Sequence, residues 1–329
     1  MTQIPFREYS ASQLRQLTGG IPVSPILPFE SPAGEIGRLN DNRGRISLSG
    51  VQSKYSVVVR DGQFQLTKSG EQGTHILKPA LSDFGNRADS PANEHLTMQV
   101  AEQVFRIETP ANALCFFQNG EAGYIIRRYD IAPDGTRIQQ EDFASLAGIS
   151  ANTHGGDYKY TALSFEDMGG LIRQYLPAWK IEMVKFFDLV LFNFLFSNGD
   201  AHIKNFSVIR NPLGDYRLSP AYDLLDTHIH LPDDSIFALE KGLFADGRTF
   251  PLGIGHKDFL EFGIALGLPE KIVVRELDRF TADYPIIEAM VSTSFLSEDV
   301  KRMYYEHYRT RLVSYLRAKT GFVYFTLNA

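Results

Sequence analysis

The sequence contains a single cysteine, Cys115, and it lacks long apolar runs and low-complexity tracts. One cysteine cannot form an internal disulfide or a cysteine-based zinc site, which fits a reducing compartment. The most apolar stretch, residues 186–196, is too short to cross a bilayer and contains Asp188 and Asn193, so it predicts a buried helix. The N-terminus lacks a basic segment followed by an apolar core. We therefore expect a cytoplasmic protein without a membrane partner.

Basic residues are also fewer than acidic ones. The chain has 33 Lys and Arg residues and 39 Asp and Glu residues, which gives a formal net charge of −6. A protein that wraps nucleic acid by itself needs a basic face to neutralise phosphates. Contact with DNA is therefore expected only indirectly, through a partner. The length of 329 residues is sufficient for two lobes, each with its own core, and a cleft between them.

The order of the expected elements indicates the fold class. Strand-like segments come first, at residues 54–60, 64–67, 75–78, 113–117 and 124–129. Among them lies one amphipathic helix at residues 92–105, with Asn93 as its expected N-cap. Helical patterns dominate later, at residues 183–196, 258–266, 270–284 and 297–319. Strands followed by helices predict an α+β molecule with a β-rich N-lobe, residues 1–132, and a mainly helical C-lobe, residues 133–329.

The sharpest chemical signal is the polar segment Asn-Gly-Asp-Ala-His-Ile-Lys-Asn, residues 198–205, directly after the expected apolar helix. In protein kinases an aspartate accepts the proton of the substrate hydroxyl, and an asparagine five residues later binds Mg²⁺. Asp200 and Asn205 have this spacing. One loop can therefore place a base beside the nucleophile and a neutral oxygen ligand on the metal. His202 or Lys204 is then a candidate donor to the γ-phosphate of ATP.

A second carboxylate is expected to complete the Mg²⁺ site. Asp223 is the candidate, because it ends the turn Ser-Pro-Ala-Tyr-Asp after a strand-like segment. The Phe-Gly pair that follows this aspartate in eukaryotic kinases is absent here, so Asp226 is an alternative ligand. Clusters of Asn, Gly and Asp also form turns that only cap strands and helices. Because two such motifs occur in the expected order, we favour the catalytic interpretation.

Two features of the expected N-lobe fit a phosphate site. Residues 44–54 carry two glycines and small side chains, and they could fold over phosphates, although alone they favour a plain hairpin. Lys78 at the end of a strand and Glu94 in the next helix repeat the kinase pair that directs an ammonium group to the α- and β-phosphates. A lysine reaching solvent and a glutamate complementing the helix dipole are the structural alternative.

Two further assignments rest on position alone. The strand at residues 124–129 is expected to lead to a hinge whose backbone binds adenine, while Asp130 contacts the ribose. Gln139, Gln140, Glu141 and Asp142 are expected to open a helix, with their acids complementing its dipole.

Seven ordered motifs between Gly44 and Asp226 resemble those of the HipA-like serine/threonine kinase toxins of bacterial toxin–antitoxin systems. They are Ser-Leu-Ser-Gly-Val-Gln-Ser-Lys, His-Ile-Leu-Lys-Pro, Asn-Glu-His, Arg-Arg-Tyr-Asp, Gln-Glu-Asp, Asn-Gly-Asp-Ala-His-Ile-Lys-Asn and Ser-Pro-Ala-Tyr-Asp. The resemblance implies a two-lobed protein-kinase-like fold, with ATP and Mg²⁺ as cofactors. It implies catalysis by Asp200, with His202 beside it, and Mg²⁺ on Asn205 and Asp223. Together with the assignments above, the expected ATP contacts are Ser49, Gly50, Val51, Gln52, Ser53, Lys54, Lys78, Glu94, Arg127, Arg128, Tyr129, Asp130, His202, Ile203, Lys204, Asn205, Tyr222, Asp223, Leu224 and Leu225.

The same resemblance suggests partners and a substrate. Longer family members carry roughly a hundred residues, the length of a small domain, before the glycine loop, whereas here that loop begins near residue 44. This shortened layout is similar to the HipT branch, which implies a helix-turn-helix antitoxin and a separate small protein resembling the absent N-terminal subdomain. Relatives phosphorylate glutamyl- or tryptophanyl-tRNA synthetase, so an aminoacyl-tRNA synthetase is the expected protein substrate.

The resemblance also implies autophosphorylation of a loop serine, Ser47 or Ser49. A phosphate there would add nearly two negative charges where the phosphates of ATP must lie, so activity is expected to fall. Two alternatives stay open. One is a small-molecule kinase of the aminoglycoside phosphotransferase type, and the other is a nucleotide-binding repressor scaffold without essential catalysis.

Overall fold

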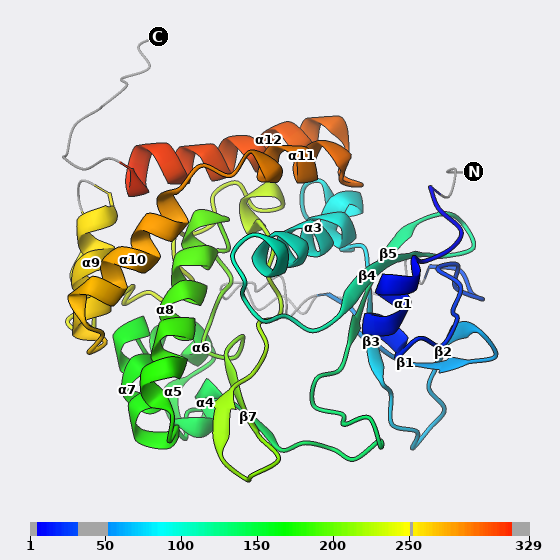
Figure 1. Cartoon of the computed structure of the whole chain (residues 1–329), viewed down its shortest axis with the longest axis horizontal. Coiled ribbons are helices and arrows are strands. Elements are labelled where there is room, and N and C mark those ends of the chain that lie inside the picture. The colour runs from blue at the N-terminus through cyan, green and yellow to red at the C-terminus, as the bar shows by residue number, and fades with distance from the viewer. Residues whose placement is uncertain (1–4, 32–51, 251–252, 318–329) are drawn as a thin grey trace.

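A computed structural model describes residues 5–31, 52–250 and 253–317 of the chain. Figure 1 shows a β-sheet with helix α1 on one side of the molecule and a larger group of helices on the other. Helix α3 lies between them, and α11 and α12 run along the top of the helical part. The fold is therefore α+β and two-lobed, as the sequence predicts.

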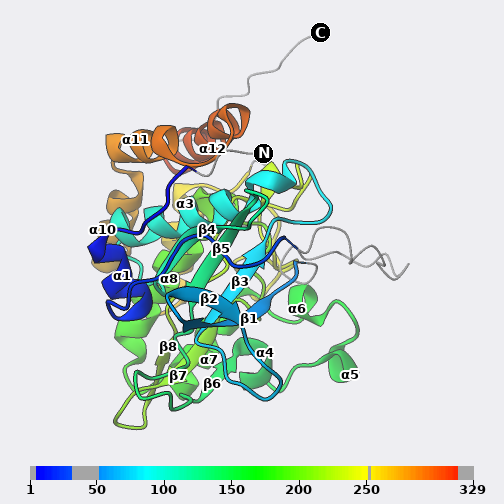
Figure 2. The ribbon, with the colours of Figure 1, turned by 90° about the vertical axis from the view of Figure 1, so that its right-hand side faces the viewer.

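The N-lobe is built on an antiparallel sheet, which within the described residues has five strands in the order β2-β1-β3-β5-β4. The strands, seen face-on in Figure 2, are β1 (Tyr55–Arg60), β2 (Gln63–Leu66), β3 (His75–Pro79), β4 (Asn112–Phe116) and β5 (Ala122–Arg127). Asp61 and Gly62, with φ of 52° and 69°, form the two-residue turn between β1 and β2. β3 ends at Pro79, as expected, because proline has no amide hydrogen for the ladder.

The N-terminal segment covers the edge of this sheet at β4. Helix α1 (Ala11–Thr18) is followed by an extended stretch in which Ile26 forms a parallel bridge with Phe116 of β4. The Tyr9 hydroxyl donates a 2.8 Å hydrogen bond to the Leu114 carbonyl on the same strand. Backbone groups that would otherwise offer an open pairing edge are thereby satisfied.

Helix α3 (Ser90–Gln103), preceded by the 3₁₀ turn η1 (Arg87–Asp89), packs against β4 and β5. It begins at Ser90, two residues before the expected start, with Asp89 at the N-cap position, so the prediction of Asn93 as its N-cap is wrong. Pro91 lies in the first turn, where proline is well tolerated because that amide has no partner within the helix. Asn93 lies inside the helix and is fully buried, with a role in contacts to the other lobe that is described below.

The C-lobe is organised around α8 (Trp179–Leu195), the buried helix that the apolar stretch predicts. Phe186, Phe187, Phe192 and Phe194 of this helix are each at most 1% exposed. The helices that precede it are α4 (Phe143–Leu146), α5 (Ala151–His154), α6 (Tyr158–Thr161) and α7 (Phe165–Tyr175). Those that follow are η2 (Thr227–Ile229), α9 (His256–Ala265), α10 (Glu270–Thr281), α11 (Pro285–Thr293), α12 (Glu298–Thr310) and η3 (Arg311–Leu316).

The last helices differ from the sequence prediction in where they break. The pattern at residues 270–284 ends as α10 at Thr281, because Pro285 begins a separate helix and restricts the residue before it. The pattern at residues 297–319 becomes α12 followed by a π-helical turn, η3.

A second sheet carries the polar loops of the C-lobe. Its described strands lie in the order β6-β7-β8: β6 (Gln140–Asp142), β7 (Ser207–Arg210) and β8 (Tyr216–Leu218). The prediction that residues 139–142 open a helix is confirmed only at its end, because a helix begins directly after Asp142 but Gln140, Glu141 and Asp142 themselves pair with β7 as a strand. Tertiary pairing overrides local propensity here. Helix α4 follows, and the Asp142 side chain caps it by accepting the Ser145 amide.

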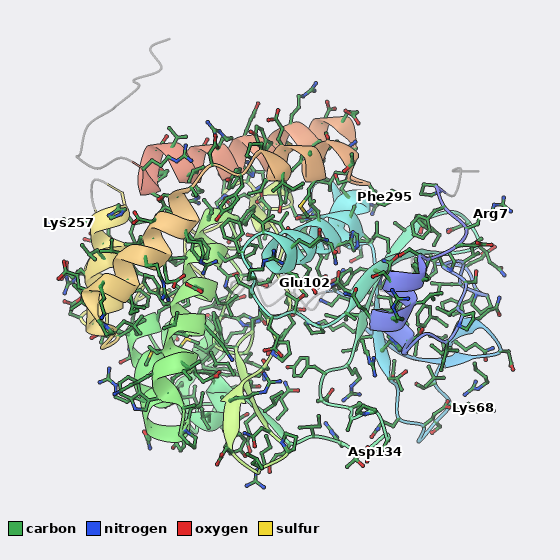
Figure 3. All side chains as sticks on the ribbon, in the orientation of Figure 1. Arg7, Lys68, Glu102, Asp134, Lys257 and Phe295 are labelled. Atoms are coloured by element: carbon green, nitrogen blue, oxygen red, sulfur yellow. The ribbon has the colours of Figure 1, made fainter. Side chains whose placement is uncertain are left out.

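Aromatic contacts join α3 to the helical lobe. Phe105, just after α3, stacks on Phe280 of α10 with ring centroids 4.7 Å apart. It also meets Phe192 of α8 edge-on. At the outer surface, the Phe6 ring lies 5.7 Å from that of Phe295, which Figure 3 places on the side facing the N-terminal segment. The end of α3 is therefore fixed to the C-lobe by its core.

Cys115 is fully buried, as expected for a small apolar side chain. None of the helices in the described part of the chain is both long and apolar enough to cross a membrane.

Candidate active site

The loop after α8 is shaped by hydrogen bonds and by one glycine. Asn198 donates from its side chain to Asn193 Oδ1 at 2.9 Å and to the Asp223 carbonyl at 3.2 Å. A Cβ atom on Gly199 would lie 2.4 Å from the Asp234 carboxylate and 2.5 Å from the Ser235 carbonyl, so only glycine fits. The loop is thus held against the segment that carries the second expected carboxylate.

Asp200 and Asn205 lie at the two ends of this loop and are both buried. The side-chain nitrogen Nδ2 of Asn205 donates to the backbone carbonyl of Asp200 at 2.9 Å. The loop therefore folds back on itself over the five residues between them. The Asp200 carboxylate accepts a 2.9 Å hydrogen bond from the hydroxyl of Tyr160 on α6. Tyr160 was not anticipated from the sequence, because it precedes the loop by 40 residues and carries no local motif.

Asp223 follows β8 in a strained backbone conformation, with φ of 55°. Few non-glycine residues adopt this region, and those that do cluster at functional sites. Its Oδ1 atom lies 2.5 Å from the Lys78 ammonium, and its Oδ2 atom lies 3.5 Å from that of Lys54. A carboxylate of the C-lobe therefore faces two cations of the N-lobe.

Lys78 also pairs with Glu94, as the sequence predicts. The Nζ to Oε1 distance is 2.6 Å, and the two side chains are 4% and 3% exposed. Burial alone would favour neutral lysine, but the charges of Asp223 and Glu94 outweigh it and hold the pKa of Lys78 above its usual value. Lys78 is thus a permanent cation, anchored between a helix of its own lobe and the metal-binding turn expected in the other.

One small cavity collects these groups, and a larger cleft opens beside it. The small cavity is lined by Gln52, Lys78, Leu81, Ser90, Glu94, Asp200, Asn205, Asp223 and Leu225. The cleft has a volume of about 710 Å³, in the range of small-molecule sites. Its walls include Lys78, Ile126, Tyr129, Tyr222 and Asp223. Together the two spaces could hold a nucleotide with its phosphates toward Lys78.

The hinge residues lie along the cleft. Arg127, Arg128, Tyr129 and Asp130 all line it. The Tyr129 ring stacks on Tyr222 with centroids 5.7 Å apart. Asp130 is 7% exposed and accepts two hydrogen bonds from the Arg128 guanidinium, so its carboxylate already has a strong partner.

The remaining expected ATP contacts are distributed unevenly. Gln52 donates to the Pro79 carbonyl at 2.9 Å, beside the small cavity. Ser53, next to it, is half-buried. Ile203 and Leu224 are buried in the hydrophobic core, so a ligand could reach only their backbone.

Lys204 is half-exposed and pairs with Asp142 at 3.1 Å. Ser47, Ser49, Gly50 and Val51 lie outside the described residues.

His202 is buried within the loop of residues 198–205, 4% exposed, with its ring edge-on to that of Tyr160 and the ring centroids 5.3 Å apart. Burial lowers its pKa, although the nearby Asp200 charge opposes the change. A neutral imidazole is therefore expected near pH 7, which would donate one hydrogen bond rather than a full positive charge.

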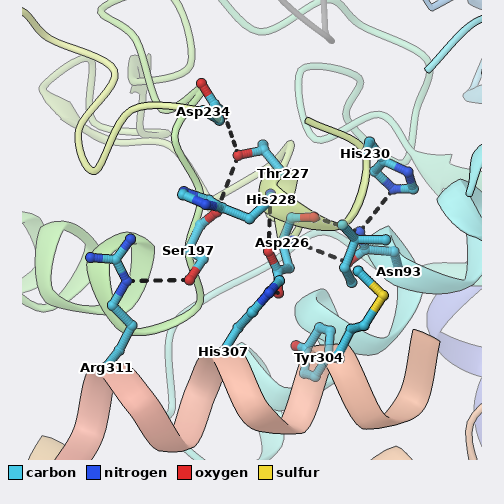
Figure 4. Close-up of polar contacts among 12 residues, drawn as sticks. Asn93, Ser197, Asp226, Thr227, His228, His230, Asp234, Tyr304, His307 and Arg311 are labelled. Carbon is cyan, nitrogen blue, oxygen red and sulfur yellow. Dashed lines mark hydrogen bonds and ion pairs between the residues drawn. The ribbon is translucent and has the colours of Figure 1, made fainter. Parts of the chain in front are cut away.

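Asp226, the alternative metal ligand, faces away from both cavities. It is 1% exposed and lies 2.7 Å from His307 Nδ1 on α12. Its backbone is held by Asn93 of α3, whose Nδ2 donates to the Asp226 carbonyl at 2.8 Å and whose Oδ1 accepts the Asp226 amide at 3.0 Å. Figure 4 shows these contacts between α12 and the segment after Asp223. This position makes Asp226 a structural residue, not a metal ligand.

The described residues include no group of three or more His, Cys, Asp or Glu side chains that could hold a metal alone. Mg²⁺ at phosphate sites commonly uses one or two protein ligands plus phosphate oxygens and water. The Asp223 carboxylate and the Asn205 amide oxygen are hard oxygen donors on one cavity, so they fit such an ion.

The fold is two-lobed, and it combines a buried lysine–glutamate pair with an aspartate on the turn opposite and a polar loop beside them. This combination is that of the protein-kinase class. The family model "HipA-like C-terminal domain" matches residues 46–285. The chain therefore belongs to this family.

Two curated relatives carry the name "Putative kinase". Y4mE of Sinorhizobium fredii is 34% identical over 57% of this chain and 44% of its own length. A Haemophilus influenzae protein is 26% identical over 92% of this chain and 91% of its own. The "Serine/threonine-protein kinase toxin HipA" of Shewanella oneidensis is 26% identical over 86% of this chain and 66% of its own length. The chain thus matches less than half of the length of Y4mE.

Among solved structures, the Shewanella oneidensis HipA, in complex with HipB and operator DNA, superposes with a TM-score of 0.66. Sequence identity is 20%, and the match covers 95% of this chain and 72% of that one. This likeness establishes the shared two-lobed fold.

Proposed function

We propose that this chain is an ATP- and Mg²⁺-dependent serine/threonine protein kinase that acts as the toxin of a bacterial toxin–antitoxin system. The observation that carries the proposal is the meeting of Lys78, Glu94, Asp200, Asn205 and Asp223 on one cavity. These residues come from both lobes, and each has the chemistry that phosphoryl transfer needs at that place. Its relatives by sequence are named as kinases, which supports the same reading.

In the proposed reaction, the oxygen of a serine or threonine hydroxyl bonds to the γ-phosphorus while the bond between that phosphorus and ADP breaks. The hydroxyl proton passes to the Asp200 carboxylate, which acts as the general base. Lys78 binds the α- and β-phosphates. Asn205 and Asp223 would hold Mg²⁺, which neutralises charge on the phosphate oxygens when bound. The chain mainly contributes placement and charge.

The proposed position of ATP is supported by the residues that line the cleft. We place the adenine along residues 127–130 and the phosphates at Lys78, with Asp130 near the ribose. His202 would donate to the γ-phosphate as a neutral group. The boundary between the lobes is proposed at residues 132–133, beside the turn in which the Gly135 amide bonds the Ala132 carbonyl.

The protein substrate and partners are proposed by family. The Shewanella HipA structure contains HipB and operator DNA. A helix-turn-helix antitoxin is accordingly proposed for this chain, with DNA contacted only through it. We further propose an aminoacyl-tRNA synthetase as substrate, a HipT-like separate small protein as second partner, and action in the cytoplasm.

Autophosphorylation at Ser47 or Ser49 is proposed as a control. The first described residues after these serines already approach the site, because Gln52 lines the small cavity and Lys54 pairs with Asp223. A phosphate added just upstream would compete with the phosphates of ATP for the same cations. Mass spectrometry of the unaltered protein and of Asp200→Asn protein tests this, because phosphate must appear only in the former.

The decisive experiment incubates the purified chain with γ-labelled ATP, Mg²⁺ and a bacterial cell extract. Label is expected on one or a few extract proteins of synthetase size, and it should be lost with Asp200→Asn or when EDTA removes Mg²⁺. Label on small molecules alone would favour the aminoglycoside phosphotransferase type. Growth arrest that persists unchanged with Asp200→Asn would instead favour a nucleotide-binding scaffold.

A further inference from the structure

Tyr160 contacts the carboxylate that we assign as the catalytic base. Its hydroxyl donates a 2.9 Å hydrogen bond to Asp200 Oδ1, and its side chain is 1% exposed. We propose that Tyr160 is a positioning residue for phosphoryl transfer, because its hydroxyl fixes the rotation of the Asp200 carboxylate. This inference rests on the proposed function and adds to it a residue that lies outside the kinase motifs.

The Asp200 backbone is held by hydrogen bonds of its own. The Asp200 amide donates to Asn198 Oδ1 at 3.3 Å, and the Asp200 carbonyl accepts from the Asn205 side chain and the His202 amide. These bonds fix the course of the loop but not the torsions of the Asp200 side chain. The bond from Tyr160 acts directly on the carboxylate, so it restrains the group that must meet the substrate hydroxyl.

Tyr160 is itself held rigidly on both sides of its short helix. The Lys159 carbonyl accepts the Ile203 amide of the catalytic loop at 3.3 Å, and the Tyr160 carbonyl accepts the Glu240 amide at 3.0 Å. The Tyr160 ring also meets the His202 ring edge-on. A donor supported in this way is already in place before substrate binds, which is the condition for efficient positioning.

Several charged groups also lie near Asp200, so a useful variant must remove the hydrogen bond alone. Among the described residues they include Lys159 on α6, His202 in the same loop, and Lys78, Glu94 and Asp223 on the cavity. Replacing Tyr160 by Phe leaves all of them in the chain, so the change isolates one hydroxyl.

A purely structural role for this hydroxyl is the competing explanation, because a buried tyrosine usually finds some acceptor. Tyr9 offers a matched control. It is also buried, at 6% exposed, and its hydroxyl donates at 2.8 Å to the Leu114 carbonyl in the N-lobe, away from the cavity. If the Tyr160 bond only contributed stability, Tyr160→Phe and Tyr9→Phe would behave alike.

The test measures ADP release from Mg²⁺·ATP, with cell extract as phosphate acceptor, for the unaltered chain, Tyr160→Phe and Tyr9→Phe. For Tyr160→Phe we expect kcat to fall on the order of 10- to 100-fold, as for loss of a hydrogen bond to a charged group. The KM for ATP should change less than about twofold, because uniform binding is retained. Tyr9→Phe should keep the kcat and the KM of the unaltered chain.

Thermal unfolding and ATP binding by calorimetry accompany the kinetics, so that misfolding of Tyr160→Phe is recognised. A well-folded Tyr160→Phe protein with unchanged kcat would overturn the inference. So would an equal loss of activity in Tyr9→Phe. Absence of ATP turnover in the unaltered chain would remove the proposed function itself, and this positioning role with it.

Discussion

Two carboxylates of the candidate site are held in different ways. Asp200 accepts a neutral hydrogen bond from Tyr160 of the same lobe, and its loop is fixed by amide side chains. Asp223 instead faces Lys78 and Lys54, two ammonium groups of the other lobe. The proposed base is thus built into one rigid lobe, whereas the expected metal ligand depends on contact between two.

From this difference we expect Asp200 and Asp223 to have separate roles. A base must keep its orientation, and short-range neutral contacts within one lobe provide that. A group that binds a cation and phosphates must exchange partners, and ion pairs across a cleft can rearrange when substrate binds. Breaking a contact at Asp223 should therefore affect both stability and nucleotide binding, while a change at Asp200 should affect the chemical step.

The largest effect is expected for Lys78→Met. Removing the buried ammonium leaves Glu94 and Asp223 without their shared cation, and such a loss costs about 3–5 kcal/mol. ATP binding should also weaken severely. Urea denaturation and calorimetry with ATP measure the two effects. A variant as stable as the unaltered chain would show that the cross-lobe ion pairs contribute little to the fold.

The next largest effect is on catalysis, where Asp200→Asn and Asp223→Asn can be compared directly. Both should lower kcat, by about 10²–10⁴ for loss of a general base. Only Asp223→Asn should also raise the Mg²⁺ concentration needed for half-maximal rate. Titration of Mg²⁺ with each variant checks this. Equal Mg²⁺ dependence in both would contradict the division of tasks.

A smaller effect is expected for Asn93→Ala, which breaks a neutral contact between the lobes. Asn93 bonds both the amide and the carbonyl of Asp226, so its loss leaves two buried backbone groups unsatisfied. The free energy of unfolding should fall by about 1–3 kcal/mol. Ser90→Ala, at another buried polar side chain of α3, is a control in which the Asp226 contacts stay intact. A loss in Asn93→Ala no larger than in this control would show that the Asp226 contact does not couple the lobes.

The Asp226–His307 pair, behind the Asp223 turn, should give a pH-dependent effect. The hydrogen bond to Asp226 raises the pKa of His307, while burial raises the pKa of Asp226. Because the folded-state pKa of His307 is raised, its stabilisation is complete below the ordinary histidine pKa and is lost as pH rises through the folded value. His307→Asn should therefore cost more stability near pH 6 than near pH 8.5.

Urea denaturation at both pH values measures this difference. Burial lowers the pKa of His228 and of His230, so these two residues act in the opposite direction. His230 is unchanged between the two proteins, whereas His228 lies beside His307 and its pKa also responds to the charge of His307. An equal loss at the two pH values would mean that the pKa of His307 is the same in the folded and the unfolded protein.

The smallest effect is expected for Lys54→Ala. Its side chain is 38% exposed and lies 3.5 Å from Asp223, so solvent screens the pair and stability should change by less than about 1 kcal/mol. Comparison with Lys78→Met separates a buried cation from an exposed one facing the same carboxylate. A loss as large as for Lys78→Met would show that exposure does not decide the contribution.

Much of the site could be anticipated because it is local in the chain. Asp200 and Asn205 lie in one loop, and Lys78 and Glu94 lie on consecutive elements, so spacing alone predicts their meeting. Apart from the breaks in the last helices, the wrong predictions concern contacts at long range. Asn93 was expected to cap its own helix but bonds residue 226, and Gln140–Asp142 was expected to be helical but pairs with β7.

The sequence alone determined the α+β lobes, the buried helix α8 and the order of the polar motifs, since these depend on periodicity and on spacing within short segments. Only the tertiary structure decided that Asp226 turns toward α12, that Tyr160 reaches Asp200 and that Asp223 lies between two lysines of the other lobe. Such contacts join residues far apart in the chain, and they form only when the hydrophobic cores fix how the elements pack.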